Sequence, residues 1–333
     1  MQKTHKITLF IVSLLLIFTS AFLFVGCGKE DDNKIRLNEV THSIFYAPLY
    51  VAINNGYFEE YGYKIELTNG GGSDASMTAL LSGSADVALL GPETGVYVNS
   101  SNKQDAPKVF GQLTKKDGSF LVGKTPEPNF SWENLRGKHV IAGRKGGSPA
   151  MSLQLAIEKN GLNITNDLNF DLSVAFNMTV GAFTGGTADY VTVFEPTASE
   201  LQREGKGYIV AAVGNESGDI PFTCFMANSS YINNNPEKIE NFLKAIKKAY
   251  NFIMTSEINE VVNSLRPSFN TSTDESIKAS ILSYKSIDAW CSSPVLTETA
   301  YNNLLNMLEN AGELTTRVPF NKVVDNTIAS RIN

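Results

Sequence analysis

The sequence has few of the residues that catalytic and metal sites usually need. Of its 333 residues only three are histidine and three are cysteine, and the histidines are His5, His42 and His139. No His/Cys spacing resembles a zinc site. A Gly-x-Ser-x-Gly nucleophile elbow and a P-loop are also missing. We therefore expect no catalytic residues, no metal and no cofactor.

Positive charge is scarcer than negative charge. The chain has 28 Lys and Arg residues against 34 Asp and Glu residues, a formal net charge of −6. Residues 1–26 contribute two lysines and no acid, so the remaining body holds 26 basic and 34 acidic residues, a net charge of −8. Such an acidic body argues against a nucleic-acid partner. Its length allows two domains.

The N-terminus is typical of an export signal. Two lysines precede the uncharged stretch Ile7–Val25, which predicts a signal peptide over residues 1–26. The following Phe24-Val25-Gly26-Cys27 resembles the lipobox of bacterial lipoproteins, in which the cysteine is lipidated and becomes the mature N-terminus. We expect a lipidated Cys27, a linker over residues 27–34 and a protein anchored to the outer face of the cell membrane. An uncleaved anchor is the alternative, because nineteen apolar residues could span a bilayer.

The body contains one pattern twice, over residues 83–93 and 186–196. In each copy, small residues and an Ala-Asp pair lead into a short apolar run and then a corner containing Pro and Glu. Each apolar run predicts a buried parallel strand, and open α/β sheets bind ligands at the carboxyl ends of such strands. We expect two α/β lobes that each offer a carboxylate corner to a shared cleft. Chance recurrence of a common helix-turn-strand unit is the alternative.

The order of patterns along the chain suggests where the lobes meet. A composition shift near Pro126 and Trp132 indicates a crossing, so we expect lobe two to cover residues 124–221. Lobe one would then consist of residues 35–123 plus 222–333. From Asn235 onward the apolar spacing is helical. The expected fold is two doubly wound α/β lobes with a hinge, with the C-terminal helices packed on lobe one.

Glycine-rich turns before two predicted helices are candidate ligand sites. Gly70-x-Gly72-x-x-Ala75 formally matches a dinucleotide fingerprint, but the preceding Lys64–Thr68 alternates as an edge strand does. We instead expect Gly72, Ser73 and Asp74 to hold a polar ligand group with backbone N–H groups, although Asp74 could simply cap its helix.

A second such turn follows Arg144, and it suits an anion or is an ordinary capped helix. Its candidate residues are Lys145, Gly146, Gly147 and Ser148.

The two corners and one aromatic pair point to a different ligand chemistry. One corner contains Pro92 and Glu93, and the other contains Glu195. The two carboxylates favour a ligand with N–H donors or positive charge, unless either glutamate pairs with Arg or Lys. Phe45 and Tyr46 could stack on a planar ligand or pack beneath the first helix. A zwitterion or an aminopyrimidine would suit both the glutamates and the anion site.

The chain resembles the type-2 periplasmic binding proteins, and within them the SsuA/thiamine-pyrimidine-synthase-like group. The resemblance rests on His42-Ser43-x-Phe45-Tyr46-Ala47-Pro48-x-Tyr50-Val51-Ala52-x-x-x-Gly56-Tyr57-Phe58, Leu81-x-Gly83-x-Ala85-Asp86, Gly91-Pro92-Glu93 and Phe194-Glu195-Pro196. It covers residues 35–325. It implies two lobes that close on a ligand by hinge motion, with loops 41–46, 70–74, 91–93, 144–148 and 194–196 lining the cleft. This adds Ser43 to the expected ligand contacts.

The resemblance implies a monomeric, non-enzymatic lipoprotein that delivers a small-molecule ligand to the permease subunits of an ABC importer. Among the group's ligands, Glu93, Glu195 and the aromatic pair favour a pyrimidine-type vitamin precursor over sulfonates, taurine or nitrate. A thiamine-pyrimidine-synthase-like enzyme and a sensor domain are the alternatives. The cysteine-rich motif of that enzyme is missing, since only Cys224 and Cys291 lie in the body. These two could pair or remain buried thiols.

Overall fold

The computed structural model describes residues 33–101 and 103–332. The predicted signal segment 1–26, Cys27 and most of the linker 27–34 lie outside the described residues. From Ile35 onward the chain forms one compact unit with cores of its own. Within the described part of the chain, every helix is too short or too polar to cross a membrane.

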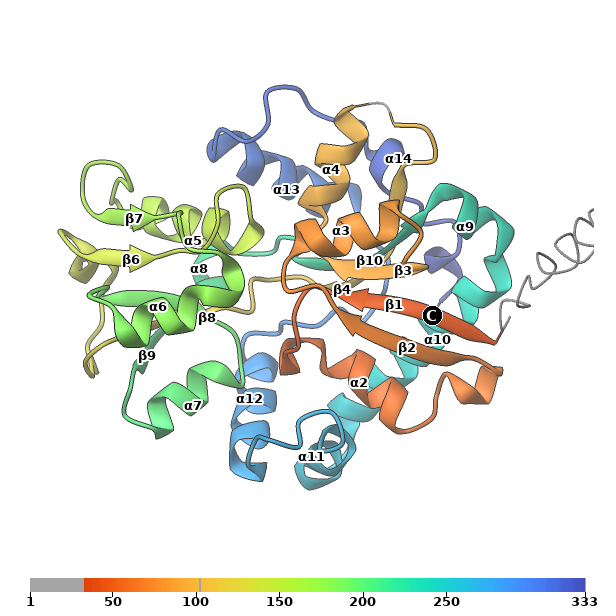
Figure 1. Ribbon diagram of the computed structural model, residues 1–333, viewed down its shortest axis with the longest axis horizontal. Helices are drawn as coiled ribbons and strands as arrows, with labels where there is room; N and C mark the ends of the chain where they lie inside the picture. The colour runs from red at the N-terminus through yellow and green to blue at the C-terminus, as the bar shows by residue number, and fades with distance from the viewer. Residues whose placement is uncertain (1–32, 102, 333) are drawn as a thin grey trace, which may run out of the picture. The chain divides into compact units, whose positions relative to one another are not determined.

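The first sheet has five strands in the order β2-β1-β3-β10-β4 (Figure 1). Strand β1 (Lys34–Glu39) is parallel to β3 (Val87–Leu90). Strand β10 (Thr223–Asn228) is antiparallel to β3 and to β4 (Pro107–Thr114). At the edge lies β2 (Lys64–Asn69), as its alternation of polar and apolar residues predicts. This sheet therefore joins strands from both parts of the predicted lobe one.

The second sheet has the order β7-β6-β8-β5-β9. Strand β6 (His139–Ile141) is parallel to β7 (Asn169–Asp171) and β8 (Tyr190–Val193), whereas β5 (Phe120–Gly123) is antiparallel to β8 and β9 (Tyr208–Ala212). We expected lobe one to extend to residue 123, but β5 lies inside the second sheet. The chain has already crossed before this buried apolar strand, so the second lobe begins at Phe120.

Two short segments connect the sheets and lie side by side, residues 115–119 and 218–222. Ile220 N donates to Lys115 O at 2.9 Å, and Phe222 N donates to Thr114 O at 3.2 Å. Asp117 lies in the first crossing and is fully buried. Two adjacent short crossings are the geometry of a hinge between lobes.

Helices surround both sheets (Figure 1). The C-terminal helices were expected on lobe one, and α10 and α11 pack there against α2, while α12 also contacts α7 and α13 contacts α5 of lobe two. The helices are α2 (Ala47–Asn54), α3 (Ser73–Leu81), α4 (Glu93–Ser100), α5 (Ser148–Lys159), α6 (Thr179–Gly185), α7 (Thr197–Arg203), α8 (Val213–Ser217), α9 (Ser229–Asn234), α10 (Pro236–Thr255), α11 (Ile258–Leu265), α12 (Asp274–Ser286), α13 (Glu298–Asn310) and α14 (Phe320–Val323).

Both copies of the repeated motif make the same connection between strands. Asp86 N donates to Arg36 O, and the Asp86 carboxylate accepts from Arg36 N, both at 2.8 Å. Asp189 N likewise donates to His139 O at 2.8 Å, and its carboxylate accepts from His139 N at 2.9 Å. The partners are 50 residues apart in each lobe. The repeat is therefore one structural joint built twice, not a chance recurrence.

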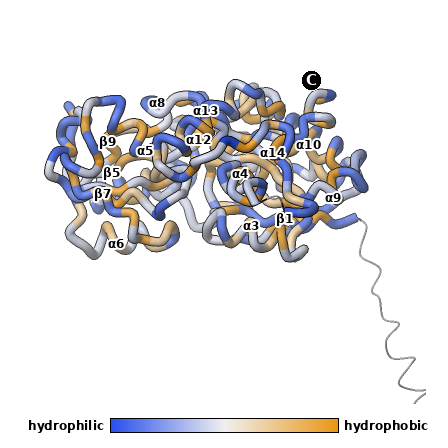
Figure 2. Tube along the Cα trace, turned by 90° about the horizontal axis from the view of Figure 1, so that it is seen from above, coloured by the Kyte–Doolittle hydropathy of each residue, from blue (hydrophilic) through white to orange (hydrophobic). Residues whose placement is uncertain are grey.

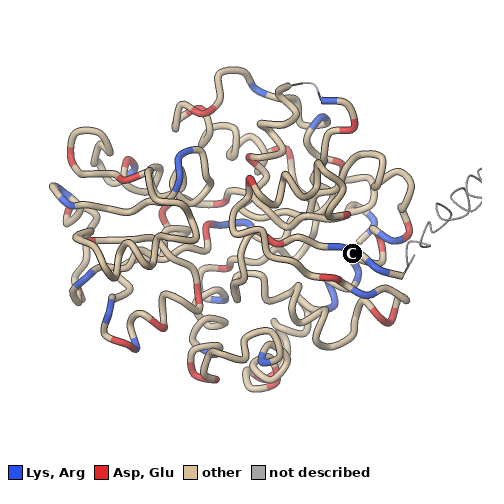
Figure 3. Tube along the Cα trace, viewed as in Figure 1, with Lys and Arg blue, Asp and Glu red and all other residues tan. Residues whose placement is uncertain are grey.

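The hydrophobic core continues from one lobe into the other at the hinge. The Phe45 ring lies 5.5 Å from Phe194, 5.9 Å from Phe222 and 5.0 Å from Tyr284, measured between ring centroids. Hydrophobic stretches follow the strands, while the outer turns are hydrophilic (Figure 2). Charged residues of both signs are spread over both lobes (Figure 3).

Candidate functional site

A partly open cavity lies between the lobes, where the parallel strands of both sheets end. We call it the interlobe cavity. The centres of water-sized molecules can occupy about 50 Å³ of it, several times the roughly 10–15 Å³ that one water needs. It is lined by Val40, Thr41, Tyr46, Gly72, Ser73, Gly91, Glu93, Ala142, Gly143, Arg144, Gly147, Ser148, Pro149, Ala150, Phe176, Phe194, Phe222 and Thr223. The lobes therefore meet around a space for a small solute, at the sheet edge where α/β proteins bind ligands.

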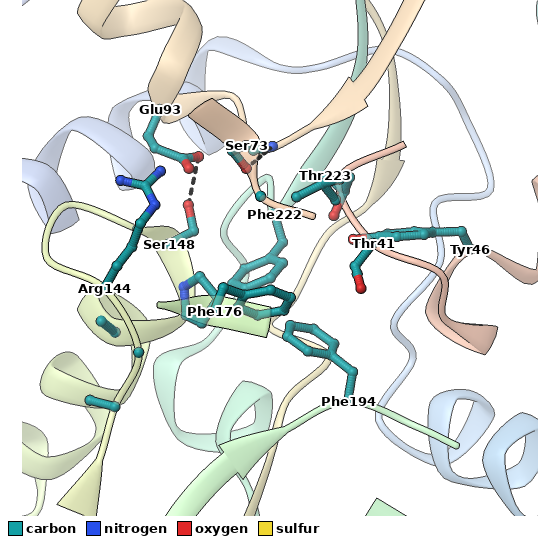
Figure 4. A pocket seen from close by; sticks show the side chains of 18 residues that line it. Thr41, Tyr46, Ser73, Glu93, Arg144, Ser148, Phe176, Phe194, Phe222 and Thr223 are labelled. Carbon is teal, nitrogen blue, oxygen red and sulfur yellow. Dashed lines mark hydrogen bonds between the residues drawn. The ribbon is translucent and has the colours of Figure 1, made fainter. Parts of the chain in front are cut away.

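Glu93 and Ser148 connect the two lobes across this cavity (Figure 4). Glu93 is the first residue of α4 in lobe one and is 1% exposed. The Ser148 hydroxyl, on the first residue of α5 in lobe two, donates to Glu93 Oε2 at 2.7 Å. Burial raises the pKa of Glu93, and the Ser148 hydrogen bond and the Arg144 charge oppose this shift. Glu93 can therefore accept a hydrogen bond from a ligand or, when protonated, donate one.

Three helix N-termini meet at the cavity wall. Helices α3, α4 and α5 begin at Ser73, Glu93 and Ser148, and all three first residues line the cavity. Ser73 Oγ accepts a hydrogen bond from Gly91 N at 3.4 Å, which joins two of these ends. Unpaired N–H groups and the helix dipole make such ends favourable for negative or polar ligand atoms.

Glycine 91 leaves the space that the Glu93 carboxylate occupies. A Cβ atom at position 91 would lie 2.1 Å from Glu93 Oε2. Any other residue there would displace the carboxylate, so the Gly-Pro-Glu corner fixes where this group lies.

Aromatic rings form the opposite part of the wall (Figure 4). Phe194 follows β8, Phe222 precedes β10, and Phe176 opens a 3-10 turn between β7 and α6. The ring centroids of Phe176 and Phe194 are 5.9 Å apart, and those of Phe194 and Phe222 are 6.1 Å apart. Burial raises the pKa of the Tyr46 hydroxyl, which lies beside Thr223. A planar or apolar ligand body would contact these rings.

Six of the thirteen predicted ligand residues line the interlobe cavity, and seven lie elsewhere. Those that line it are Tyr46, Gly72, Ser73, Glu93, Gly147 and Ser148. Those outside its wall are Ser43, Phe45, Asp74, Pro92, Lys145, Gly146 and Glu195. Contact with a ligand stays a prediction for all thirteen residues, and the cavity wall supports it for the first group.

Glu195 faces its own helix instead of the cavity. Its carboxylate accepts hydrogen bonds from Ser199 N at 2.9 Å and Ser199 Oγ at 2.8 Å, in the first turn of α7. Ser283 of lobe one donates to the same carboxylate at 3.4 Å. The residue is fully buried, and burial raises its pKa. It thus satisfies a helix end and joins the lobes, and its partners within the described part of the chain are serine donors rather than the Arg or Lys that we left open.

Phe45 and Ser43 belong to the hinge. Phe45 is fully buried in the core shared by both lobes, which was the alternative to stacking on a ligand. Ser43 accepts from Phe45 N at 3.1 Å and donates to the backbone oxygen of Glu195 at 2.6 Å. Their place in the loop before α2 is therefore structural, and only Tyr46 of the aromatic pair reaches the cavity.

Of the other four predicted residues, three make contacts between the lobes and one is buried. Asp74 is 3.6 Å from Arg144 across the cleft, and Lys145 is 3.9 Å from Glu313. Gly146 O accepts from the Tyr97 hydroxyl at 3.1 Å. Pro92 precedes the first turn of α4. These contacts hold the lobes together around the cavity without lining it.

Sequence reasoning missed most of the apolar wall. Phe176 follows β7, which ends at Asp171, and its ring lies at the cavity wall. Phe194 belongs to the Phe194-Glu195-Pro196 motif, and Phe222 is the first residue of the second part of the predicted lobe one. Both were treated as backbone landmarks, because their wall position arises only when the two lobes pack together.

Metal and thiol chemistry find no support in the described residues. Among residues 33–101 and 103–332, no group of three His, Cys, Asp or Glu side chains is arranged to hold a metal ion. Cys224 and Cys291 are both free thiols. Burial raises the pKa of Cys224 and raises that of Cys291 to about 12, so neither is a reactive thiolate near neutral pH.

Two sheets, two crossings and a cavity between them are the two-lobed fold of the periplasmic binding proteins. A solved structure with this fold is the alkanesulfonate-binding protein SsuA of Xanthomonas axonopodis pv. citri bound to MOPS. It is 16% identical and has a TM-score of 0.69, and the match covers 86% of this chain and 96% of that one.

The chain belongs to the NMT1/THI5 like family, whose model matches residues 44–257. It is similar to YtlA of Bacillus subtilis, provisionally described as a binding protein, with 36% identity over 312 residues and 93% of each chain covered. It is also similar to the uncharacterized lipoprotein MG412 of Mycoplasma genitalium, with 24% identity over 201 residues, 56% of this chain and 50% of that one. The predicted family and fold are confirmed.

Proposed function

We propose that the protein captures a small organic solute between its lobes outside the cytoplasm and delivers it to an ABC importer. The observation that carries this proposal is the interlobe cavity, with Glu93 of lobe one joined to Ser148 of lobe two. A solute held there would contact both lobes. Only such a solute can stabilise their closure, because a ligand shifts an equilibrium by its difference in affinity for the two states.

For the solute we favour a pyrimidine-type vitamin precursor. Glu93 offers a carboxylate to ring or amino N–H groups, and Phe176, Phe194 and Phe222 offer apolar faces to a planar ring. Glu195 no longer contributes to this argument, since its carboxylate is occupied by Ser199. The preference therefore rests on one carboxylate and the aromatic wall.

An anionic solute such as a sulfonate is the second candidate. Arg144 and the N-terminus of α5 line the same cavity and favour negative charge. The relative from Xanthomonas axonopodis is named for binding alkanesulfonates. Taurine and nitrate belong to this candidate as well.

A thermal-shift screen tests the binding role and separates the two solute classes. The chain from Gly28 onward would be heated with aminopyrimidines, riboflavin, taurine, alkyl sulfonates and nitrate. A ligand at a hundred times its dissociation constant should add about 2.7 kcal/mol of stability. At the same ligand concentration, a heterocycle shift should fall to about half or less in Glu93→Gln, and a sulfonate shift should fall likewise in Arg144→Gln. If the whole panel leaves the melting temperature unchanged, these solute classes are wrong.

We also propose that the chain acts as a monomeric lipoprotein anchored through Cys27 and partnered by permease subunits. Labelling cells with a radioactive fatty acid tests the anchor. The wild-type chain should carry label, and Cys27→Ala should carry none. If the wild-type chain carried no label and kept residues 1–26, an uncleaved anchor would be indicated instead.

An enzymatic role and a sensor role are the competing proposals. An enzyme of thiamine-pyrimidine assembly would form the pyrimidine, whereas a binding protein should return its solute unchanged after incubation. A sensor domain would leave uptake of the solute intact when the gene is deleted, whereas loss of an importer's binding protein should abolish that uptake.

A further inference from the structure

The loop between β1 and α2 connects three parts of the molecule. Val40, Thr41 and Tyr46 of this loop line the interlobe cavity. Ser43 donates to the backbone oxygen of Glu195 in lobe two. His42 lies between these residues but does not line the cavity. Contacts that fix the position of His42 therefore also fix part of the cavity wall.

Both ring nitrogens of His42 face oxygen acceptors. Nδ1 lies 2.9 Å from Glu39 Oε1, and Nε2 lies 2.8 Å from Ser268 O. A backbone carbonyl cannot donate, and the second oxygen of Glu39 already accepts the Tyr50 hydroxyl. A neutral imidazole has one N–H and one lone pair, so it would turn a lone pair toward one acceptor. Only the imidazolium, with two N–H groups, donates to both.

The surroundings of the ring favour this charged form. The ring stacks on Phe269 with centroids 4.6 Å apart, and it meets the edge of Tyr50 at 4.8 Å. Glu39 on β1 and Tyr50 on α2 are the titratable groups that face it, while the segment after α11 presents the Phe269 ring and the Ser268 carbonyl. The hydrogen bond with Glu39 is the main cause that raises the pKa of His42. The side chain remains 40% exposed, so water can exchange its protons.

We propose that His42 is a positioning residue of the interlobe cavity. As an imidazolium it ties the Val40–Tyr46 segment to Glu39 on one side and to Ser268 on the other, and so fixes the wall that this segment supplies. When the ring loses its second proton, one of the two bonds is lost and the segment is released on that side. This inference deepens the proposed solute-binding role, but its test needs no solute.

The first measurement is a nitrogen-15 NMR titration of the histidine side chains. The body contains only His42 and His139, so the variant His139→Gln assigns both sets of signals. His139 is a matched control because it also pairs with one carboxylate, Asp171 at 3.2 Å, but lies in lobe two. We expect both nitrogens of His42 to be protonated at pH 7, with a midpoint above the usual value of about 6.5. A neutral tautomer at pH 7, or a midpoint at or below 6.5, would overturn the proposal.

The second measurement follows the cavity segment itself. The Trp290 indole N–H donates to Phe45 O at 2.8 Å, so its resonance reports the position of this segment. Trp132, which packs in the lobe-two core, is the internal control. We expect the Trp290 resonance to move with the His42 midpoint in the wild-type protein and in His139→Gln, and to stay constant over that range in His42→Gln.

The wild-type titration decides the matter even if His42→Gln does not fold. A Trp290 resonance that stays constant while His42 titrates would show that the ring does not position the segment. Failure of every solute in the binding screen would leave both midpoints unaffected, so the two proposals can fail separately.

Discussion

The two corners of the molecule contain the same residues in opposite order. In lobe one, Pro92 precedes Glu93, which becomes the first residue of α4 and lines the cavity. In lobe two, Glu195 precedes Pro196 and stands outside α7, where it accepts from the backbone and hydroxyl of Ser199. The order of Pro and Glu therefore distinguishes the two corners. In one order the carboxylate is available to a ligand, and in the other it completes a helix end.

The corners also differ in the donors and charges that offset the cost of burying each carboxylate. Glu93 has the Ser148 hydroxyl and the nearby Arg144 charge, whereas Glu195 has only neutral donors. A third buried carboxylate, Asp117 in the hinge crossing, accepts from Ser119 N at 2.6 Å, and its other oxygen has no partner within the described residues. These three groups form a series from ligand-facing to structural, and each can be tested separately.

The largest effect should come from Asp117, the least compensated of the three. Burial raises the pKa of Asp117 to about 7, against about 3.9 for an unperturbed aspartate. Because the folded-state pKa is raised, its stabilising proton is present at low pH and is lost as the pH rises from about 4 through 7. We expect Asp117→Asn to gain about 2–3 kcal/mol relative to wild type between pH 5 and pH 8. Denaturant unfolding at both pH values measures this, and an equal difference at the two pH values would contradict it.

The next effect tests whether the two corners rest on equivalent joints. Asp86 also makes an ion pair with Arg36, at 2.5 Å, whereas the Asp189 carboxylate accepts from His139 N and makes a longer ion pair with Lys138, at 3.7 Å. We expect Asp86→Ala to lower the unfolding free energy by about 2 kcal/mol and Asp189→Ala by about 1 kcal/mol, since hydrogen bonds to charged groups contribute the most. Urea unfolding of both variants provides the measurement. A larger loss for Asp189→Ala would mean that the joints differ in kind.

The contrast between the glutamates is sharpest in binding. For a heterocyclic solute we expect Glu93→Gln to weaken the affinity by roughly tenfold to thirtyfold, as removal of a charge-assisted hydrogen bond does. The matched variant Glu195→Gln should leave the affinity within about twofold, since its carboxylate faces Ser199. Isothermal titration calorimetry of both variants gives the comparison. Equal losses would place both carboxylates at the ligand after all.

The smallest effect is on stability at the second corner. Glu195→Ala should cost about 1 kcal/mol, the usual range for losing a helix-end acceptor. Ser199→Ala removes the hydroxyl donor but keeps the backbone N–H, so its cost should be smaller. Thermal unfolding without solute would reveal the order, and a larger cost for Ser199→Ala would contradict the capping role.

The fold could be predicted from sequence because its signals are local and repeated. The Ala-Asp joints, the edge alternation of Lys64–Thr68 and the helical spacing after Asn235 all describe one element at a time. The predicted end of lobe one at residue 123 was wrong, because the apolar sequence Phe120–Gly123 suits a strand of either sheet. Only the strands that pair with β5 decide to which sheet it belongs. The residues of the candidate site could be predicted only in part, for the same reason. Gly72, Glu93 and Ser148 follow from helix starts, whereas the aromatic wall depends on packing between lobes.

The adjacent residues Phe45 and Tyr46 illustrate this limit. Both lie in one 3-10 turn and both are buried. The turn directs Phe45 into the shared core and Tyr46 to the cavity, and no property of the two side chains in the sequence distinguishes them. Glu195 shows the same limit in a charged residue, because its role depends on where α7 begins.

The placement of β10 has a consequence for the order in which the two sheets can form during synthesis. Strand β10 lies between β3 and β4, so the centre of the first sheet is empty until residue 228 is available. All strands of the second sheet lie within residues 120–212, and that sheet can form from contiguous chain. As the chain emerges from its N-terminus, the sheet of the second lobe can therefore be completed first, while β3 and β4 lack the strand that lies between them. Unpaired strand edges are sites of aggregation, so the new chain is most prone to aggregate before residue 228 emerges.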